Sequence, residues 1–231
     1  MSVPGPILLC VAAPAECERV LAAFGAAGPT TPGSRVQLSA GARGVELLAT
    51  GVGPTAAGVS VAASLAHRSA SAVVSLGIAG AYQASGVGVL DTVCSDRSVL
   101  AGEGRAESAG FTGLAAMGFG PFDGEDWAET SPDLVTRLAP SCKRVGPIAT
   151  VSSVSGTDAL AAQLHARTGA VAEAMEGAAV HLAGSRMGVP FVEVRVISNI
   201  AGDRERHPWK LAESLGLLGP LSRAVADALA E

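Results

Sequence analysis

Short apolar runs bounded by Gly and Pro alternate with Ala-rich stretches along most of this chain. Such alternation is typical of α/β layering, in which buried strands are followed by helices that pack on a sheet. The pattern predicts strands at residues 7–12, 35–38, 45–50, 72–76, 90–95, 147–151 and 191–197. It predicts helices at residues 15–24, from about 54 to 67, at 172–187 and at 211–230.

No internal repeat or linker interrupts this pattern, so we expect residues 1–231 to form a single domain. Residues 102–132 are the exception to the alternation, because they are rich in Gly, Glu and Asp and lack periodic apolar positions. Long irregular segments in compact domains are usually functional. We therefore expect a loop or lid over a site there.

The composition narrows the classes of partner. Hydrophobic residues make up 48% of the 231 positions, which is enough for a large core, and aromatic residues only 3%. The formal net charge is −5, and no run of Lys and Arg exceeds two residues. Base stacking and electrostatic attraction to phosphates are thus disfavoured, so we expect neither a nucleic-acid nor a membrane partner. The expected ligand is a small molecule.

The cysteines Cys10, Cys17, Cys94 and Cys142 contain no CxxC pair, and we expect reduced, buried thiols. The apolar stretch at 7–13 resembles a signal-peptide core, but no Lys or Arg precedes it and acidic residues follow directly. It is better interpreted as a first buried strand. No apolar run is long enough to span a membrane, so a cytoplasmic protein is expected.

Ligands of layered α/β folds gather at the carboxyl ends of strands. The segment AAPAECE places Glu16 at a helix start, where backbone N–H groups favour an anion, although for this segment alone an ordinary first-turn Glu is the simpler interpretation. TGVGP and SLGIAGAY are Gly-rich strand ends, which allow a backbone to approach a ligand closely or form simple turns. Neither segment has the spacing GxGxxG or GxxxxGK[ST], so NAD and ATP are disfavoured as ligands.

Two further segments carry polar residues in apolar surroundings. In EAMEGAA, Glu173, Met175 and Glu176 are expected on the 172–187 helix, where at least one carboxylate needs a partner unless both are solvated. In RVISNIAGDRER, Asn199 directly follows a buried strand, where its amide must be hydrogen-bonded. The charged loop after it is ordinarily solvated.

These segments, in this order, resemble the nucleoside phosphorylase and nucleosidase superfamily, and most closely its futalosine-hydrolysing branch. The resemblance rests on the Glu of AAPAECE and on TGVGPTAAG, SLGIAGAY, GVGVLDTV, GPIATVSSVSGT, AMEGAAV, GVPFVEVRVISN and AGDRER. It implies an α/β fold of the three-layer αβα type with a mixed central β-sheet. It also implies cleavage of the N-glycosidic bond of a purine nucleoside, without a metal or an organic cofactor.

By this similarity, Glu16 would position and deprotonate the attacking water, and Glu176 would accept hydrogen bonds from the ribose hydroxyls. Met175 would lie against the sugar, and Glu173 has no such role and is structural or solvated. Asn199 stands where adenine-specific relatives have Asp, and its amide can donate to the O6 of hypoxanthine. The resemblance extends the substrate-binding set to Gly53, Ile78, Ala79, Gly80, Val154, Met175, Arg204 and Arg206.

Two assignments stay open at this point. The proton for N7 of the departing base could come from Asp203 or from water. The carboxylate at the 5′ extension of futalosine could meet Arg204, Arg206 or His207, or Arg97 or Arg105 beside the expected lid. For any one of these arginines a solvated surface position is the simpler interpretation.

The alternatives are a purine nucleoside phosphorylase, an adenine-specific nucleosidase and a non-catalytic protein that keeps only the fold. Phosphate as nucleophile needs cations, whereas AAPAEC carries Glu16 and VVSLGIAG carries no Arg. Asn199 disfavours adenine, and the presence of both Glu16 and Glu176 argues for catalysis. Superfamily members commonly form homodimers or larger homo-oligomers, so such an assembly is expected here. The resemblance also implies a role in the futalosine route to menaquinone.

Overall fold

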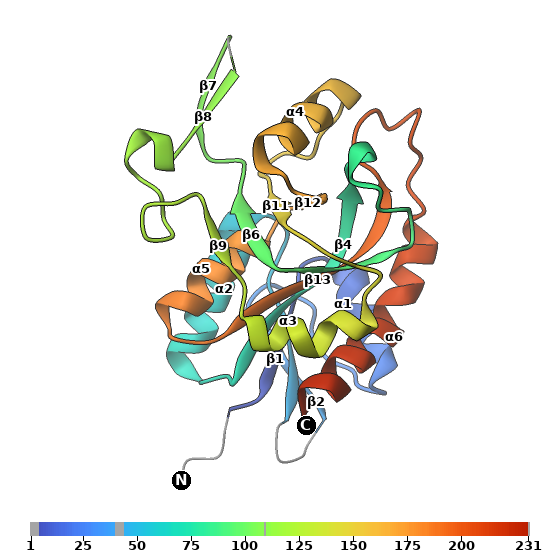
Figure 1. Ribbon diagram of the computed structural model, residues 1–231. Coiled ribbons are helices and arrows are strands. Elements are labelled where there is room, and N and C mark those ends of the chain that lie inside the picture. The colour runs from blue at the N-terminus through green and yellow to red at the C-terminus, as the bar shows by residue number, and fades with distance from the viewer. Residues whose placement is uncertain (1–4, 40–43, 109, 231) are drawn as a thin grey trace.

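Helices cover both faces of a central β-sheet in this protein, as Figure 1 shows. The computed structural model describes residues 5–39, 44–108 and 110–230. Within these residues eleven strands form one sheet, and parallel and antiparallel neighbours are mixed in it. The predicted three-layer α/β architecture with a mixed sheet is therefore confirmed.

The sheet runs in the order β10-β5-β13-β4-β12-β11-β6-β9, with β1 beside β4, β3 beside β1 and β2 beside β3. Its strands are β1 (Ile7–Val11), β2 (Arg35–Ser39), β3 (Val45–Ala49), β4 (Ala72–Ala81), β5 (Thr92–Ser95), β6 (Arg97–Leu100), β9 (Trp127–Glu129), β10 (Arg144–Val145), β11 (Ile148–Thr150), β12 (Ala172–Ala174) and β13 (Phe191–Ile200).

The helices are α1 (Pro14–Ala23), α2 (Pro54–His67), α3 (Pro132–Leu138), α4 (Asp158–Thr168), α5 (Gly177–Arg186) and α6 (Leu211–Ala230). Helices α1 and α3 each contact α6 on one face of the sheet, and α2 packs against α5 on the other. The predicted closing helix at 211–230 has the bounds that the sequence indicated.

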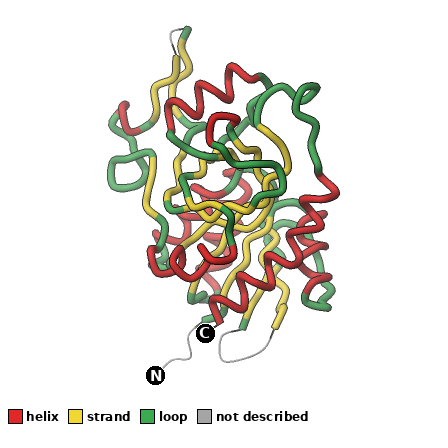
Figure 2. Tube along the Cα trace, turned by 45° about the vertical axis from the view of Figure 1, so that its right-hand side comes forward, coloured by secondary structure: helices red, strands yellow, loops and turns green. Residues whose placement is uncertain are grey.

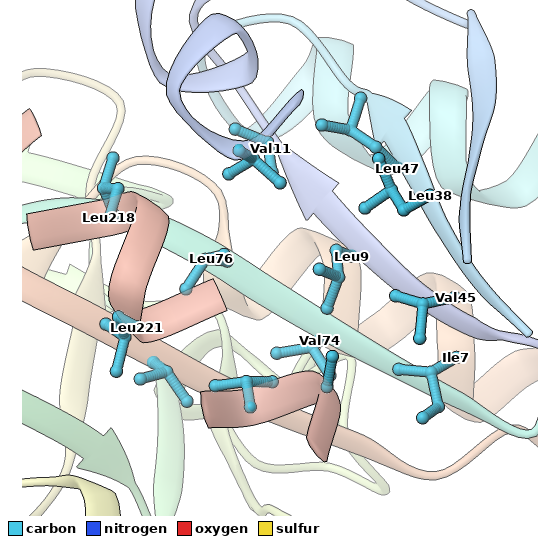
Figure 3. Close-up of a cluster of buried hydrophobic side chains, with 14 of the residues drawn as sticks. Ile7, Leu9, Val11, Leu38, Val45, Leu47, Val74, Leu76, Leu218 and Leu221 are labelled. Carbon is cyan, nitrogen blue, oxygen red and sulfur yellow. The ribbon is translucent and has the colours of Figure 1, made fainter. Parts of the chain in front are cut away.

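The alternation of side chains along β1 divides the core into two layers. Ile7, Leu9 and Val11 face the side of α1 and α6, and Figure 3 shows them with leucines of α6. Leu8 and Cys10 face the opposite side, toward α2 and α5. All five are buried, and each large apolar side chain so placed contributes about 1.5–3 kcal/mol.

The two longest strands, β4 and β13, are parallel neighbours in the middle of the sheet. β13 runs three residues beyond the predicted end at 197, because Asn199 and Ile200 still pair with Gly80 and Ala81 of β4. The carboxyl ends of both strands therefore lie side by side. This edge positions the site described below.

The sequence prediction of one helix at 172–187 was wrong. Ala172–Ala174 form strand β12, and α5 begins only at Gly177. Ala-rich sequence favours helix, but here β11 and β4 flank the segment and satisfy its backbone groups on both sides. Glu173 thus lies on a strand, and Glu176 lies just before a helix rather than within it.

Residues 102–132 are more regular than expected. They include the two-stranded hairpin β7 (Gly104–Glu107) and β8 (Gly110–Gly113) and the strand β9, which pairs with β6. The hairpin projects from the body of the molecule in both Figure 1 and Figure 2. The four cysteines are free, and all but the half-buried Cys142 are buried. Among the described residues, no helix has the length and apolarity needed to cross a bilayer.

Candidate active site

A cavity of about 420 Å³ opens at the carboxyl ends of β1, β4 and β13. Most of the predicted site residues line it, and they come from six separate segments of the chain. The lining includes Glu16, Ile78, Ala79, Gly80, Val154, Met175, Glu176, Asn199 and Arg204. None of the described residues of 102–132 is part of this lining, so the expected lid is wrong for this cavity.

Glu16 enters the cavity from the first turn of α1. Its helix starts with Pro14 after the extended Ala13, and Glu16 follows at the third helical position. The carboxylate accepts one hydrogen bond from the Ala13 N–H at 2.9 Å and another from the Ile78 N–H at 2.9 Å. Two backbone donors on different elements therefore fix its orientation, and only 5% of Glu16 is exposed.

Glu176 enters the same cavity from the N-terminal end of α5. Its Oε1 accepts a hydrogen bond from the Gly53 N–H at 3.0 Å. Gly53 has φ +92°, a conformation that favours glycine, and this turn aims its N–H at the carboxylate. Gly53 is not itself part of the cavity lining, so it orients Glu176 from behind.

Arg195 on β13 lies between these carboxylates, and the sequence analysis did not single it out. Its Nε donates to Glu193 Oε1 at 2.8 Å and its Nη2 to Ser75 Oγ at 2.9 Å. The same Nη2 lies 3.4 Å from Glu176 Oε2. The ion pair of Glu193 and Arg195 could have been predicted from the stretch FVEVRV. Residues two apart on a strand share a face, and opposite charges on a buried face imply pairing.

Burial dominates the electrostatics of this cluster. Burial raises the pKa of Glu16, although the hydrogen bonds from Ala13 and Ile78 and the positive charge of Arg195 lower it in part. Burial likewise raises the pKa of Glu193, against Arg195. Burial alone would lower the pKa of Arg195, but Glu193, Glu176 and Glu16 outweigh it and raise that pKa. The guanidinium therefore stays cationic, with three carboxylates around it.

Gly77 on β4 provides the space for this cluster. A Cβ at position 77 would lie 2.6 Å from Arg195 Nη1 and 2.7 Å from Glu16 Oε1. Ordinary van der Waals contacts begin at 3.4 Å. Any larger residue would therefore push apart the two groups that meet over this strand.

Asn199 lies at the end of β13 and is 5% exposed. Its Oδ1 accepts a hydrogen bond from Ser198 Oγ at 2.8 Å, and its Nδ2 donates to the Ile200 carbonyl at 2.9 Å. An amide NH₂ has two hydrogens, so one remains to donate into the cavity. The hydrogen-bonded environment expected for this amide is present.

Glu173 lines the cavity and is 3% exposed, so the solvated alternative for this residue is wrong. Its Oε1 accepts a hydrogen bond from the Ser155 N–H at 2.7 Å, and its Oε2 accepts one from Ser155 Oγ at 2.6 Å. Ser155, which also lines the cavity, was not identified from the sequence.

The loop after β13 separates the charged residues predicted there. Arg204 lines the cavity, and its guanidinium carbon lies 5.0 Å from the ring centre of Trp209. Asp203 and Arg206 are not part of the lining. The Asp203 N–H donates to Asp158 on α4, and Arg206 also pairs with that carboxylate, which anchors the loop to α4.

This chain is similar to known proteins over nearly its whole length. The family model described as the phosphorylase superfamily matches residues 6–230. A futalosine hydrolase of Streptomyces coelicolor is 36% identical, covering 92% of this chain and 91% of the relative. A futalosine hydrolase of Acidothermus cellulolyticus is 39% identical, covering 93% of this chain and 87% of the relative.

Among solved structures, the 5′-methylthioadenosine/S-adenosylhomocysteine nucleosidase of Helicobacter pylori superposes with a TM-score of 0.78 at 17% identity, covering 99% of this chain and 100% of that one. The futalosine hydrolase of the same organism superposes with a TM-score of 0.76, also at 17% identity, covering 98% and 99%. At this level of identity the two structures confirm the fold alone.

Proposed function

Because the chain belongs to the phosphorylase superfamily, and within it to the futalosine hydrolases, we propose that it hydrolyses the N-glycosidic bond of futalosine. The products are hypoxanthine and dehypoxanthine futalosine, and the reaction belongs to the futalosine route to menaquinone. One observation carries the mechanism. Glu16 reaches a cavity from the first turn of α1 and Glu176 reaches the same cavity from the residue before α5, with Arg195 between them.

The transition state of such a cleavage resembles a ribosyl cation. Positive charge grows at C1′ and O4′ while negative charge builds on the departing base, and a water attacks C1′. Glu16 is the base in our proposal: it orients this water and takes its proton. The raised pKa of its buried carboxylate suits this role, because a base is most effective when its pKa is near the working pH.

Glu176 binds the sugar in this mechanism. Its Oε1 is held by the Gly53 N–H, and its remaining lone pairs can accept hydrogen bonds from the ribose hydroxyls. The carboxylate thereby places negative charge beside the developing cation. Met175, the preceding residue, lies against the face of the sugar.

Asn199 binds the base. Its free amide hydrogen donates to O6 of hypoxanthine, a position where adenine has a donor of its own. The backbone of Ile78, Ala79 and Gly80 forms the floor beneath the ring. Asp203 lies outside the cavity lining, so of the two proton sources for N7 we favour water.

Arg204 is the arginine that we assign to the carboxylate of the 5′ extension. It lines the cavity together with Trp209, whose ring offers an apolar surface to the aromatic group of that extension. Arg206 is paired with Asp158 instead. Val154 contributes apolar lining to the same cavity.

A phosphorolytic reaction does not fit this cluster. Phosphate would have to approach Arg195, whose guanidinium already faces Glu16, Glu176 and Glu193. An added anion would be repelled by these carboxylates, whereas a neutral water is not. Hydrolysis is therefore the reaction that the cavity supports.

Base release tests the proposal. The purified protein is incubated with futalosine, inosine and 5′-methylthioadenosine, with and without phosphate, and the free bases are separated by chromatography. We expect hypoxanthine from futalosine at a rate that does not depend on phosphate. A rate proportional to phosphate, or preferential release of adenine from methylthioadenosine, contradicts the proposal.

We also propose that the protein acts in the cytoplasm as a homodimer or larger homo-oligomer. Exposed apolar side chains support an assembly, since Val59 of α2 is 65% exposed and Met187, directly after α5, is 45% exposed. Mass measurement by light scattering at micromolar concentration tests it. A monomer mass of 22.8 kDa contradicts it.

A further inference from the structure

Three neighbouring strands place a carboxylate, a bare glycine and an amide in one row across the sheet. Gly80 of β4 pairs with Glu173 of β12 on one side and with Asn199 of β13 on the other. Side chains of directly paired residues point to the same face of a sheet. Strands are about 4.8 Å apart, so the Cα atoms of Glu173 and Asn199 are roughly 10 Å apart.

Gly80 places no side chain between these two residues. A Cβ at position 80 would lie 3.2 Å from Asn199 Nδ2 and 3.4 Å from the Cβ of Ala201, so the amide and Ala201 bound the space above this glycine. Glu173, Gly80 and Asn199 all line the cavity. The row therefore forms a slot with a flat backbone floor and one polar group at each end, a shape that fits the edge of a planar base.

The carboxylate at one end of the slot is a fixed acceptor. Ser155 donates both its backbone N–H and its hydroxyl to Glu173, one to each oxygen. An ionised carboxylate has about four lone-pair sites, so it can still accept another N–H. The Glu173 carboxylate also lies close enough to the buried Tyr82 to raise the pKa of that hydroxyl, after burial itself.

The two ends of the slot match the hydrogen-bonding edge of a 6-oxopurine. Such a base presents the O6 acceptor next to the N1–H donor, whereas adenine presents a donor at N6 and an acceptor at N1. Asn199 supplies a donor and Glu173 an acceptor. With adenine, the carboxylate would face the N1 lone pair without a proton between them, so two acceptors would repel each other.

We propose that Glu173, held in place by Ser155, accepts the N1–H of the base and selects hypoxanthine over adenine. This rests on the proposed function, since it assigns a specificity residue to the same site. Asn199 contacts only the 6-position of the base, so the neighbouring N1 has to be recognised by another residue. A carboxylate cannot become a donor without binding a proton.

The test compares Glu173→Gln with the wild type on futalosine and on its 6-amino analogue. Gln keeps the shape of the side chain but can turn an N–H toward the base, so kcat/KM for futalosine should fall about 10- to 100-fold, the effect of losing one charge-assisted hydrogen bond. The kcat/KM for the 6-amino analogue should fall less or should rise. The ratio of kcat/KM for futalosine to that for the analogue should therefore fall at least about 10-fold. Glu18→Gln, on the exposed side of α1, removes the same charge and should leave both values unchanged.

If Glu173 had a purely structural role, Glu173→Gln would lower kcat/KM for both substrates by the same factor. An active Glu173→Gln variant with an unchanged ratio of the two kcat/KM values therefore overturns the proposal. If the variant does not fold, the proposal is tested on the wild-type protein instead. Its affinities for hypoxanthine and for 1-methylhypoxanthine are measured by calorimetry. The methyl group replaces the N1–H, and we expect at least about 100-fold weaker binding; equal affinity overturns the proposal. Failure of the proposed function would appear separately, as a wild type that releases no base from futalosine.

Discussion

Gly77→Ala tests whether the spacing of Glu16 and Arg195 sets the rate. The new Cβ would lie 2.7 Å from Glu16 Oε1 and 2.6 Å from Arg195 Nη1, against an ordinary minimum of 3.4 Å. The carboxylate must therefore move by about 0.7 Å and the guanidinium by about 0.8 Å. Glu16 Oε1 accepts from the Ile78 N–H at 2.9 Å, and a shift of that size weakens or breaks this bond.

We expect kcat for hypoxanthine release to fall about 10- to 100-fold, because misplacing a reacting group by about 1 Å can cost 10²-fold. Overpacking of this kind should also lower the free energy of unfolding by about 1–3 kcal/mol. Base release is followed by chromatography and stability by urea unfolding.

Gly216→Ala is the matched control. Gly216 lies in α6, and an added Cβ there meets no atom within 4 Å. This variant should keep full activity and gain up to about 1 kcal/mol from helix propensity. A Gly77→Ala enzyme with wild-type kcat would refute the reasoning about the spacing of the two charged groups.

Four more predictions follow from the same cluster and its surroundings. Because burial raises the pKa of Glu16 and the base must be ionised, a pH profile of kcat/KM should lose activity on the acid side with a midpoint above 4.5; a midpoint below that value contradicts the assignment. Because the pKa of Glu16 is higher in the folded protein than in the unfolded chain, this carboxyl stabilises the fold below pH 4.5. That contribution is lost as the pH rises through the pKa of Glu16 in the folded protein, and urea unfolding at several pH values measures the loss. Glu193→Ala leaves Arg195 without its Nε partner and should cost about 3–5 kcal/mol in urea unfolding, so a loss below about 1 kcal/mol would count against the pairing. Arg204→Ala should raise KM for futalosine about 10-fold and leave KM for inosine unchanged. An equal change in KM for both substrates, or no change for either, contradicts the contact with the 5′ extension.

Residue types and their order along the chain were sufficient to predict much of the site. Glu16 lies shortly after β1 and Asn199 near the end of β13, and a layered fold brings strand ends to one edge of the sheet. Their convergence therefore follows from local pattern plus general topology. The helix at 211–230 was predictable because its apolar periodicity is long and uninterrupted.

The environment of Glu173 and Glu176 could not be predicted in this way. The sequence around them is Ala-rich and favours helix locally, but the segment at 172–174 becomes a strand because β4 and β11 offer partners on both sides. Pairing over such distances in sequence leaves no local signal. The hydrogen bonds of Ser155 to Glu173 depend on that same pairing and were invisible for the same reason.

The central claim, that Glu16 is the base that activates water, is tested most directly by Glu16→Ala. The account predicts that kcat for hypoxanthine release from futalosine falls at least about 10²-fold, while the affinity for futalosine stays within about tenfold and added formate restores part of the rate. Hypoxanthine release at more than about one tenth of the wild-type rate without formate would contradict it.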